Sequence, residues 1–530
     1  MPEESNPTLT GPADGLAVAR AAGANRFICQ GDRVIVCLDD RVGVLSVEAD
    51  GIPFVEDLLT DFGPCGNVLS TPGNARRELL SAQGVMLEDV FVLPRLPGAV
   101  LQWVPPDRRA FSASLKWACP VGTDPTRSGS TLRLSPAGEG GTYTTFRVEP
   151  EPEEWSFEHR DGKWEIRAKV NIPAGEALSW IAGSAARPTV ADATVATLDK
   201  LGPQEAVQGG WLRELAEQHL RTRTGVHEID SALEWAKARA SGYDAASLPR
   251  LLAQLGSGLL REAKLTLDKL ADERSPDFGH GLGEYLMWTG DYGAPAGYLS
   301  HLHSWLEMLS ASHWTGPLPP HGRLADALDG LGYPDESDAV KRLDSQVGGG
   351  APIVLPMAGQ PQSASPRTDP DSAWLHFRGL TAACSSGAIR SKEEGALDPG
   401  YELVVVLLDN LLHVRGEASL GRLALSPALP EHLTSFQVEG IRVGNGGIDF
   451  RMDREGDRTR YLFQPTSGAM PLNLIFEPSL PGIELEEALI DGAIAELDWV
   501  ERGKRITPRL QFPVDRERTV EFSVKRSESD

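Results

Sequence analysis

Short stretches that alternate between apolar and polar positions fill the first part of the chain. Over residues 131–134 and again over residues 164–170, every second side chain is apolar. Comparable β-branched stretches recur from residue 26 to about residue 197, separated by turn residues every ~8–12 positions, which is typical of antiparallel sandwich strands. We therefore expect an all-β domain over residues 1–198.

The pattern then changes to helical spacing. Ile229, Leu233, Ala236 and Ala240 lie on one face of a predicted helix. Further amphipathic helices are predicted at 246–256, 259–272, 280–289, 294–311, 322–332, 335–346, 372–384 and 400–414. Because most of their links are short, we expect antiparallel helical hairpins in a middle domain over residues 199–415.

Residues 348–371 interrupt this regularity. The segment contains GGG and several Pro and Ser residues, and no charged residue precedes Arg367. It is too long for an ordinary connector in a compact domain. It is either a mobile functional loop or a place where helices are missing.

Strand patterns return after Glu417. Phe436 and Val438 alternate with Gln437 and Glu439, and GNGG at residues 444–447 joins two such stretches, as a hairpin turn does. We expect a second antiparallel sandwich over residues 416–530. The fold class is therefore multidomain, with a β sandwich, a helical domain and another β sandwich.

Composition indicates a folded protein with a neutral ligand. The chain has 530 residues, 41% of them hydrophobic, and 51 Lys and Arg against 75 Asp and Glu give a net charge of −24. Such a charge disfavours nucleic acid and anionic membrane surfaces. A neutral ligand such as a sugar is not repelled by this negative charge.

The chain also lacks the usual signs of export. Its first residues show no secretory signal, and its longest apolar run, residues 403–408, is too short to span a membrane. The five cysteines are Cys29, Cys37, Cys65, Cys119 and Cys384, an odd number without a CxxC motif. We expect buried free thiols in a reducing cytoplasm rather than a disulfide framework or zinc site, although Cys29 and Cys37 could pair across neighbouring strands.

Several segments resemble the six-hairpin glycosidases. Gly421, Leu423, Leu425, Pro427 and the Leu-Pro at 429–430 carry a G-x-L-x-L-x-P-x-L-P pattern. This stretch resembles the C-terminal β domain of the glycogen-debranching (amylo-α-1,6-glucosidase) type and of its glucoamylase-like and rhamnosidase-like relatives. GVHEIDSALEWAKARA looks like the first toroid helices of that group, and GLGEYLMWTGD is similar to one of its recurring helix ends.

The resemblance implies an N-terminal β supersandwich, a central (α/α)6 toroid and a C-terminal antiparallel β sandwich. The family's toroid normally has twelve helices, whereas the 201 residues from Leu212 to Leu412 hold about ten predicted helices. We therefore expect an incomplete toroid. Tyr243 and Asp244 stand where the family usually has an Arg-Asp pair, so its arginine is absent.

Glycoside hydrolysis with inversion requires a carboxylic acid and a carboxylate base ~6.5–9.5 Å apart. The resemblance implies a base in the loop before the last helix, where Glu393 and Glu394 lie. The alternative is that this loop is merely a hydrophilic surface.

The candidates for the acid are Asp244, Asp277 and Glu284, which lie near predicted helix starts and loops. Each has a structural alternative. Asp244 could cap a helix that begins at Ala245. Asp277 could be a turn residue. Glu284 could be an exposed helix position instead of a buried carboxyl with a raised pKa.

Aromatic side chains are the candidates for sugar binding. Trp314, Tyr243, Trp288 and Trp374 all lie in the predicted helical domain. Trp314 is the most ligand-like because SHWTGPLPPHG reads as a loop, whereas Trp288 could equally be a packing residue. His301 and His303 diverge on a helix, so we expect no metal site, and no motif indicates a cofactor.

Two hypotheses follow. The first is a glycoside hydrolase that acts on α-linked gluco-oligosaccharides with inversion. The second is a catalytically degenerate relative that binds carbohydrate or acts as a scaffold. An incomplete toroid would expose apolar helix faces, which a homodimer could cover.

Overall fold

The computed structural model describes residues 18–526 apart from 22–25, 32, 40–42, 82–83, 121, 137, 139–140, 201–210, 212, 216–218, 243–245, 312–321, 348–368, 386–397, 467–468 and 503. The chain divides into two compact units. The first holds residues 1–217, 238–245 and 383–391, and the second holds residues 218–237, 246–382 and 392–530.

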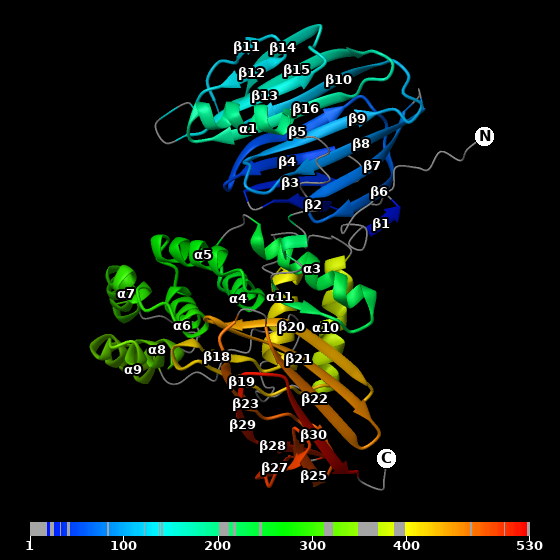
Figure 1. Ribbon diagram of the computed structural model, residues 1–530. Helices are drawn as coiled ribbons and strands as arrows, with labels where there is room; N and C mark the ends of the chain where they lie inside the picture. Colours follow the sequence, from blue (N-terminus) through cyan, green and yellow to red (C-terminus); the bar gives the residue numbers. More distant parts are fainter. Residues whose placement is uncertain are drawn as a thin grey trace, which may run out of the picture. The chain divides into compact units, whose positions relative to one another are not determined.

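The first unit is a sandwich of two antiparallel sheets, as Figure 1 shows. One sheet has the order β1 (Val18–Ala21), β6 (Cys65–Thr71), β7 (Asn74–Ser81), β8 (Gly84–Val92), β9 (Gly98–Val104), β16 (Leu178–Ala185), β13 (Tyr143–Glu149), β12 (Thr131–Leu134) and β11 (Thr126–Ser128). The other has the order β14 (Glu154–Arg160), β15 (Lys163–Ile172), β10 (Phe111–Cys119), β5 (Ile52–Thr60), β4 (Gly43–Ala49), β3 (Val34–Asp39) and β2 (Arg26–Gln30).

The core of the first unit lies between these sheets. Trp103 and Trp180 from one sheet and Trp117 from the other are fully buried in it. The alternation predicted over residues 164–170 is confirmed, because Ile166, Ala168 and Val170 are buried in this core while Arg167 and Lys169 between them are exposed. Three of the five cysteines, Cys29, Cys119 and Cys384, are buried, and Cys37 and Cys65 are partly exposed.

Helix α1 (Pro188–Lys200) covers the outer face of the first sheet. Val195 and Leu198 join Val100 and Ile181 in a second apolar cluster there. This helix is missing from the sequence-based prediction, which placed strands up to about residue 197. The helical spacing of apolar residues in α1 is hard to detect in the sequence, because the buried side of the helix also contains Thr194, a polar residue.

The second unit begins with a set of helices that agree with the predicted ones to within a few residues. They are α3 (His227–Ser241), α4 (Leu248–Ser257), α5 (Leu260–Asp272), α6 (Phe278–Thr289), α7 (Ala294–Ala311), α8 (Gly322–Gly330), α9 (Pro334–Val347), α10 (Pro370–Ser385) and α11 (Pro399–Val405). Helix α11 continues into a π-helical segment, Val406–Leu411. It packs on α4, so the last of these helices returns to one of the first.

Three glycines make α6 the central helix of this set. A methyl group on Gly279 would lie 2.3 Å from Trp305 of α7, and one on Gly281 would lie 2.7 Å from Leu251 of α4. A methyl group on Gly283 would lie 2.8 Å from the backbone N of Leu324 in α8. The GHGLG pattern therefore allows three neighbouring helices to approach the α6 backbone closely.

The C-terminal sheets complete the second unit. A seven-stranded sheet has the order β17 (Arg221–Thr222), β20 (Ser435–Val443), β21 (Gly446–Glu455), β22 (Arg458–Pro465), β30 (Arg518–Lys525), β25 (Glu484–Ile490) and β26 (Ala493–Ile494). Two smaller sheets have the orders β18 (Arg415–Glu417), β19 (Arg422–Leu425), β23 (Leu472–Phe476), β29 (Leu510–Val514), and β24 (Leu480–Pro481), β28 (Arg505–Pro508), β27 (Trp499–Arg502).

Two details refine the predicted C-terminal sandwich. The hairpin turn predicted at GNGG is confirmed, since β20 ends at Val443 and β21 begins at Gly446. The expectation of a purely antiparallel sandwich is wrong in one place, because β19 pairs with β23 in parallel. These two strands are connected through the β20–β22 hairpins, which leave the smaller sheet and return to it.

Candidate functional site

A buried carboxylate lies in the middle of the central helix α6. The Glu284 side chain is 10% exposed, and its Oε2 accepts a hydrogen bond of 2.5 Å from Nη1 of Arg323, the second residue of α8. The close approach at Gly283 brings the two helices together at this point. Arg323 Nη2 also donates to the backbone oxygen of Gly416 at 2.7 Å, so one guanidinium connects α6, α8 and β18.

A second carboxyl comes from the π-helical segment. Arg415 Nη1 donates to Asp409 Oδ1 at 2.7 Å. Burial raises the pKa of the Asp409 carboxyl, although the Arg415 guanidinium opposes part of the effect. Its side chain is nevertheless 38% exposed, so solvent reaches the group. π-Helical turns inside α-helices occur frequently at functional sites.

His280 lies one turn before Glu284 on α6. Its Nε2 lies 3.9 Å from Glu284 Oε1. Burial lowers the pKa of the His280 imidazole, although the Glu284 and Asp277 carboxylates act in the opposite direction. Asp409 and Arg323 also influence its pKa. The histidine is therefore neutral at pH 7, and it marks the place where the carboxyls and guanidiniums of this cluster come within electrostatic range of each other.

Asp277 is the third carboxyl of the cluster and directly precedes α6. Its side chain makes no capping hydrogen bond, so this aspartate does not use the role that its position offers. Burial raises the pKa of the Asp277 carboxyl, and His280 opposes the shift only in part. An aspartic acid with a raised pKa keeps its proton to higher pH than usual.

A small hollow lies beside the start of α6. It has a volume of about 250 Å³ and is lined by Asp272, Arg274, Phe278, His301 and Trp305, among others. The Trp305 indole donates to the backbone oxygen of Pro276 at 3.1 Å, which fixes the ring. Aromatic walls with a few charged groups are typical of small polar-ligand sites.

We call Asp277, His280, Glu284, Arg323, Asp409 and Arg415 the α6 cluster. Burial raises the pKa of two of its carboxyls, Asp277 and Asp409, and guanidiniums pair with two of them, Glu284 with Arg323 and Asp409 with Arg415. Among the described residues, no group of His, Cys, Asp or Glu is arranged to hold a metal ion. Within the same part of the chain, no helix combines the length and hydropathy of a membrane span.

The structure locates some of the predicted catalytic residues and not others. Glu393, Glu394 and Asp244 lie outside the described residues. Asp277 and Glu284 are brought into the α6 cluster. The interpretation of Glu284 as an exposed helix position is wrong, because α6 buries it against α8. The helix predicted to begin at Ala245 begins at Leu248 in the structure, and its N-cap is Ser247.

Two of the four aromatic residues predicted to bind sugar lie within the described residues, and two lie outside them. Tyr243 and Trp314 lie outside the described residues. Trp288 is 6% exposed and packs near Gly416, and its backbone oxygen accepts from Gly444 N at 2.6 Å. Trp374 is 7% exposed and stacks on Phe377, with ring centroids 5.6 Å apart.

Sequence reasoning missed His280, Arg323, Asp409 and Arg415. Asp409 carried a signal, because it interrupts a long apolar helix in VVVLLDNLL. A single acid within a buried apolar run requires a partner or a function. Arg323 carried no comparable signal, since nothing in the sequence relates it to Glu284.

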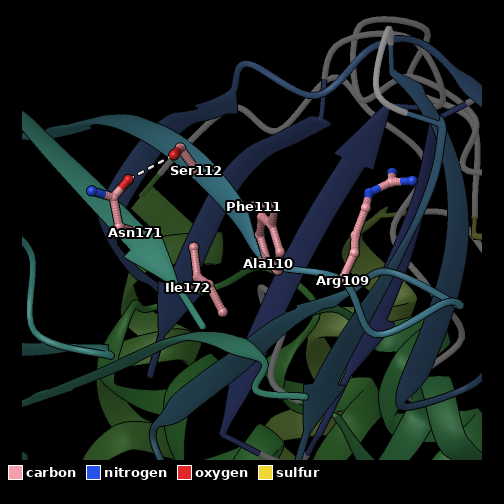
Figure 2. A pocket seen from close by; sticks show the side chains of 6 residues that line it. All are labelled: Arg109, Ala110, Phe111, Ser112, Asn171 and Ile172. Atoms are coloured by element: carbon pink, nitrogen blue, oxygen red, sulfur yellow. Dashed lines mark hydrogen bonds between the residues drawn. The ribbon is translucent and has the colours of Figure 1, made fainter. Parts of the chain in front are cut away.

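A different hollow lies in the first unit. Figure 2 shows this space of about 540 Å³, with Ser112 Oγ donating to Asn171 Oδ1 at 2.6 Å and Arg109 standing apart from them. The other lining residues are Ala110, Phe111 and Ile172. This hollow has no carboxyl or imidazole among its lining residues, so we do not assign acid–base chemistry to it.

No protein-family model matches the chain, and no curated protein matches it. Solved structures do match. A protein from the human microbiome, provisionally described as a kojibiose phosphorylase, superposes with a TM-score of 0.54 over 94% of this chain and 92% of its own, at 7% identity. An inverting mannosidase of family GH92 from Bacteroides thetaiotaomicron gives 0.48 over 92% and 91%, at 11% identity. A bacterial glucoamylase in complex with acarbose gives 0.35 over 62% and 67%, at 10% identity.

At these identities the likeness concerns the fold. The chain shares nearly its whole length with the fold of the first of these structures, so it has a fold that occurs among carbohydrate-active proteins. The predicted resemblance to six-hairpin glycosidases is thereby confirmed at the level of a glycosidase-like fold. The multidomain combination of antiparallel sandwiches and helices is likewise confirmed.

Proposed function

We propose that this protein binds and cleaves glycosides, with α-linked gluco-oligosaccharides as its substrates and with inversion at the anomeric carbon. One observation carries the proposal. Burial raises the pKa of the Asp277 carboxyl, whose side chain makes no capping hydrogen bond to α6, and the next residue, Phe278, lines a small hollow with an aromatic wall. The glycosidase-like fold agrees with this chemistry.

Asp277 is the proposed general acid. It gives its proton to the glycosidic oxygen while the bond from that oxygen to the anomeric carbon breaks. A water oxygen bonds to the anomeric carbon from the opposite side, and the proton of that water passes to a carboxylate base. We keep Glu393 or Glu394, which precede α11 in the sequence, as the proposed base.

The other members of the α6 cluster position Asp277. Glu284 and Arg323 anchor α6 to α8, and His280, one turn along α6 from Asp277, acts on the pKa of the Asp277 carboxyl in the opposite direction to burial. We propose Trp314 as the aromatic face on which a sugar ring stacks. Trp288 and Trp374 would support this region through packing, since both are buried.

An assay can show whether water or phosphate is the nucleophile that attacks the anomeric carbon. Hydrolysis requires water alone, whereas a phosphorylase transfers the glycosyl group to phosphate. The similar structure from the human microbiome is described as a kojibiose phosphorylase. Turnover should therefore be measured with and without inorganic phosphate, and we expect it to proceed without phosphate.

The test uses the full chain with maltose, isomaltose, panose, trehalose, kojibiose and aryl α-glucosides. Asp277→Asn should lower kcat/KM by about 10²-fold or more, the usual size of a general-acid contribution. Aryl glycosides with good leaving groups should lose less, because they need little protonation. Asp326→Asn, at an exposed position of α8, is the matched control and should leave kcat/KM unchanged.

The same panel tests the base. Glu393→Gln or Glu394→Gln should abolish turnover of natural and activated substrates alike, since water activation is needed for both. Turnover that survives Asp277→Asn on natural substrates would contradict the role of Asp277. Full activity in both glutamine variants would contradict the role of these two glutamates.

A second candidate function is carbohydrate binding without cleavage. It is favoured by the pairing of two carboxyls of the α6 cluster with guanidiniums, Glu284 with Arg323 and Asp409 with Arg415, as in structural ion pairs. Binding of the oligosaccharides without turnover would support this function. Neither binding nor turnover on the panel would overturn both candidates.

A further inference from the structure

A charged pair lies inside the N-terminal sandwich, far in sequence from the α6 cluster. Arg77 on β7 and Glu88 on β8 have side chains that are only 4% and 2% exposed. Arg77 Nε donates to Glu88 Oε1 at 2.6 Å, and the Trp103 indole donates to Glu88 Oε2 at 2.8 Å. Arg77 Nη1 also donates to the backbone oxygen of Asp39 at 3.0 Å.

A buried ion pair of this kind needs an explanation other than stability. The desolvation of two charges often exceeds their attraction, so apolar residues of similar volume would serve a core at least as well. The positions before and after the pair on the inner face, Ala75 and Leu79 on β7 and Met86 and Val90 on β8, are apolar. The pair is thus a polar interruption of an apolar surface, which is a pattern expected at functional sites.

The pair borders a cavity. A space of about 340 Å³, partly open to solvent, lies between β4 and β5 of one sheet and β6, β7 and β8 of the other. Arg77 and Glu88 form its polar wall, and Leu58, Leu79 and Phe62 form its apolar walls. Phe62 packs against Trp103 and Phe111, with ring centroids 6.4 and 5.9 Å apart, so its ring is held in place. The volume lies at the lower end of the range for small-molecule sites.

The polar wall has unused hydrogen-bonding capacity. A guanidinium has five N–H donors, and the contacts of Arg77 within the described structure use three of them. A carboxylate has about four acceptor positions, of which Glu88 also uses three. The Arg77 guanidinium, a donor, and the Glu88 carboxylate, an acceptor, are therefore adjacent. This arrangement suits a hydroxyl group, because a hydroxyl can both accept and donate a hydrogen bond.

We propose that this cavity is a binding site for a neutral polyhydroxy compound of monosaccharide size. The charge of the wall is internally neutralised, so the cavity holds no net charge to attract an ion. An anion would also meet the protein's net charge of −24. Two neighbouring hydroxyls reach Arg77 and Glu88, while the ring carbons of the ligand lie against Phe62 and Leu79. This inference does not depend on the proposed glycosidase activity.

The test is isothermal titration calorimetry of the full chain with D-glucose, D-galactose, D-mannose and myo-inositol. We expect at least one of these probes to bind the wild type. Thr60→Phe places a ring in the cavity, because Thr60 lines it. This change should weaken binding by at least about tenfold, which corresponds to ~1.4 kcal/mol.

Leu59→Phe is the matched control. Leu59 precedes Thr60 on β5, so its side chain points to the opposite face of the sheet, and the added ring does not enter the cavity. Binding should be unchanged. Near-ultraviolet circular dichroism and thermal melting of both variants show whether they fold, and a Thr60→Val variant replaces Thr60→Phe as the milder change if the latter does not fold.

A second pair of variants tests the polar wall. Glu88→Gln should weaken binding, whereas Asp89→Asn should not, because the neighbouring Arg76–Asp89 pair faces the outside of the sandwich. Absence of binding for all four probes at tens of millimolar would overturn the proposal. So would binding that Thr60→Phe and Glu88→Gln both leave intact. Asp277→Asn should not affect this binding, which separates the outcome from that of the glycosidase proposal.

Discussion

Arg77 and Glu88 are directly opposite each other in the β7–β8 register, and so are Arg76 and Asp89 one position along. The first pair points into the sandwich and the second points out of it, with side-chain exposures of 4% and 2% against 19% and 13%. Two strands thus present nearly the same chemical pair in two environments. The difference between the pairs isolates the effect of burial.

Glu88→Gln should lower the free energy of unfolding by about 3–5 kcal/mol, because it leaves the Arg77 charge buried without a counter-ion. Asp89→Asn should cost only about 1 kcal/mol, since water still reaches Arg76. Urea denaturation of both variants measures the difference. Equal losses would show that burial of the inner pair does not govern its energy.

Arg323→Met should destabilise the second unit by about 2–4 kcal/mol, because Glu284 would lose its cation while remaining buried. Adding Glu284→Leu should restore much of this loss, since the unpaired charge is then gone. Arg261→Met, at an exposed position of α5, is the control and should change stability by less than about 0.5 kcal/mol. A double variant no more stable than Arg323→Met would contradict the pairing.

Gly283→Ala should cost about 1–3 kcal/mol, because the new methyl group would meet the backbone of Leu324 at 2.8 Å and α8 cannot yield easily. Gly379→Ala in α10 should instead stabilise by about 0.4–1 kcal/mol, since no atom lies within 4 Å of its added methyl group. Thermal melting of the two variants should shift in opposite directions. A stabilised Gly283→Ala would show that α6 and α8 are less closely packed.

His219 should make the protein sensitive to acid. Burial, aided by Lys237 and Arg442, lowers the pKa of His219 to about 4. An unfolded histidine has a pKa of about 6.5, so between these values the unfolded chain binds a proton that the folded chain does not. Stability is therefore fully present above pH ~6.5 and falls as the pH decreases toward ~4.

The loss of stability caused by His219 is limited because its side chain is partly exposed. We expect His219→Gln to remove about 1–3 kcal/mol of the loss between pH 7 and pH 4, less than the full shift would give because the side chain is not fully buried. Denaturant titrations at several pH values measure it. His227→Gln, at an exposed position of α3, should leave the pH profile as it is.

Cys65 reports on the cavity of the N-terminal sandwich, because it lines that cavity and is partly exposed. We expect iodoacetamide to modify Cys65 and Cys37 before the buried Cys29, Cys119 and Cys384. A saturating concentration of the monosaccharide that binds should slow the reaction at Cys65 and not at Cys37. Peptide mass spectrometry at each time point distinguishes the two sites, and equal slowing at both would contradict ligand protection.

The sequence predicted most of the fold because local periodicity is strong in this chain. Helices α4 to α10 begin and end within a few residues of the predicted positions, and the alternation on β15 matches its burial. The strands β5 to β8 were harder to detect, since β7 carries Arg76, Arg77 and Glu78 in succession. Three charged residues in a row hide the fact that the middle one points inward.

The candidate site was predicted less completely than the fold. Asp277 and Glu284 were selected from their positions near a helix start, and the structure brings both into one cluster. Their partners Arg323 and Asp409 come from other helices, 39 residues after Glu284 in the case of Arg323. Such pairings depend on how the helices pack. The spacing of apolar residues in a single sequence shows which face of each helix is buried, but not which residues of two helices lie opposite each other.

Strand β17 has a consequence for how the protein is made. Arg221 precedes the helices yet pairs with Glu439 of β20, 218 residues later. While the ribosome synthesises the intervening segment, this strand has no partner and the nascent helices lack the sheet against which α4 and α6 pack. The second unit must therefore complete its folding late in translation or after release, when chaperones are most needed. A fragment that ends before residue 430 would leave that edge permanently open.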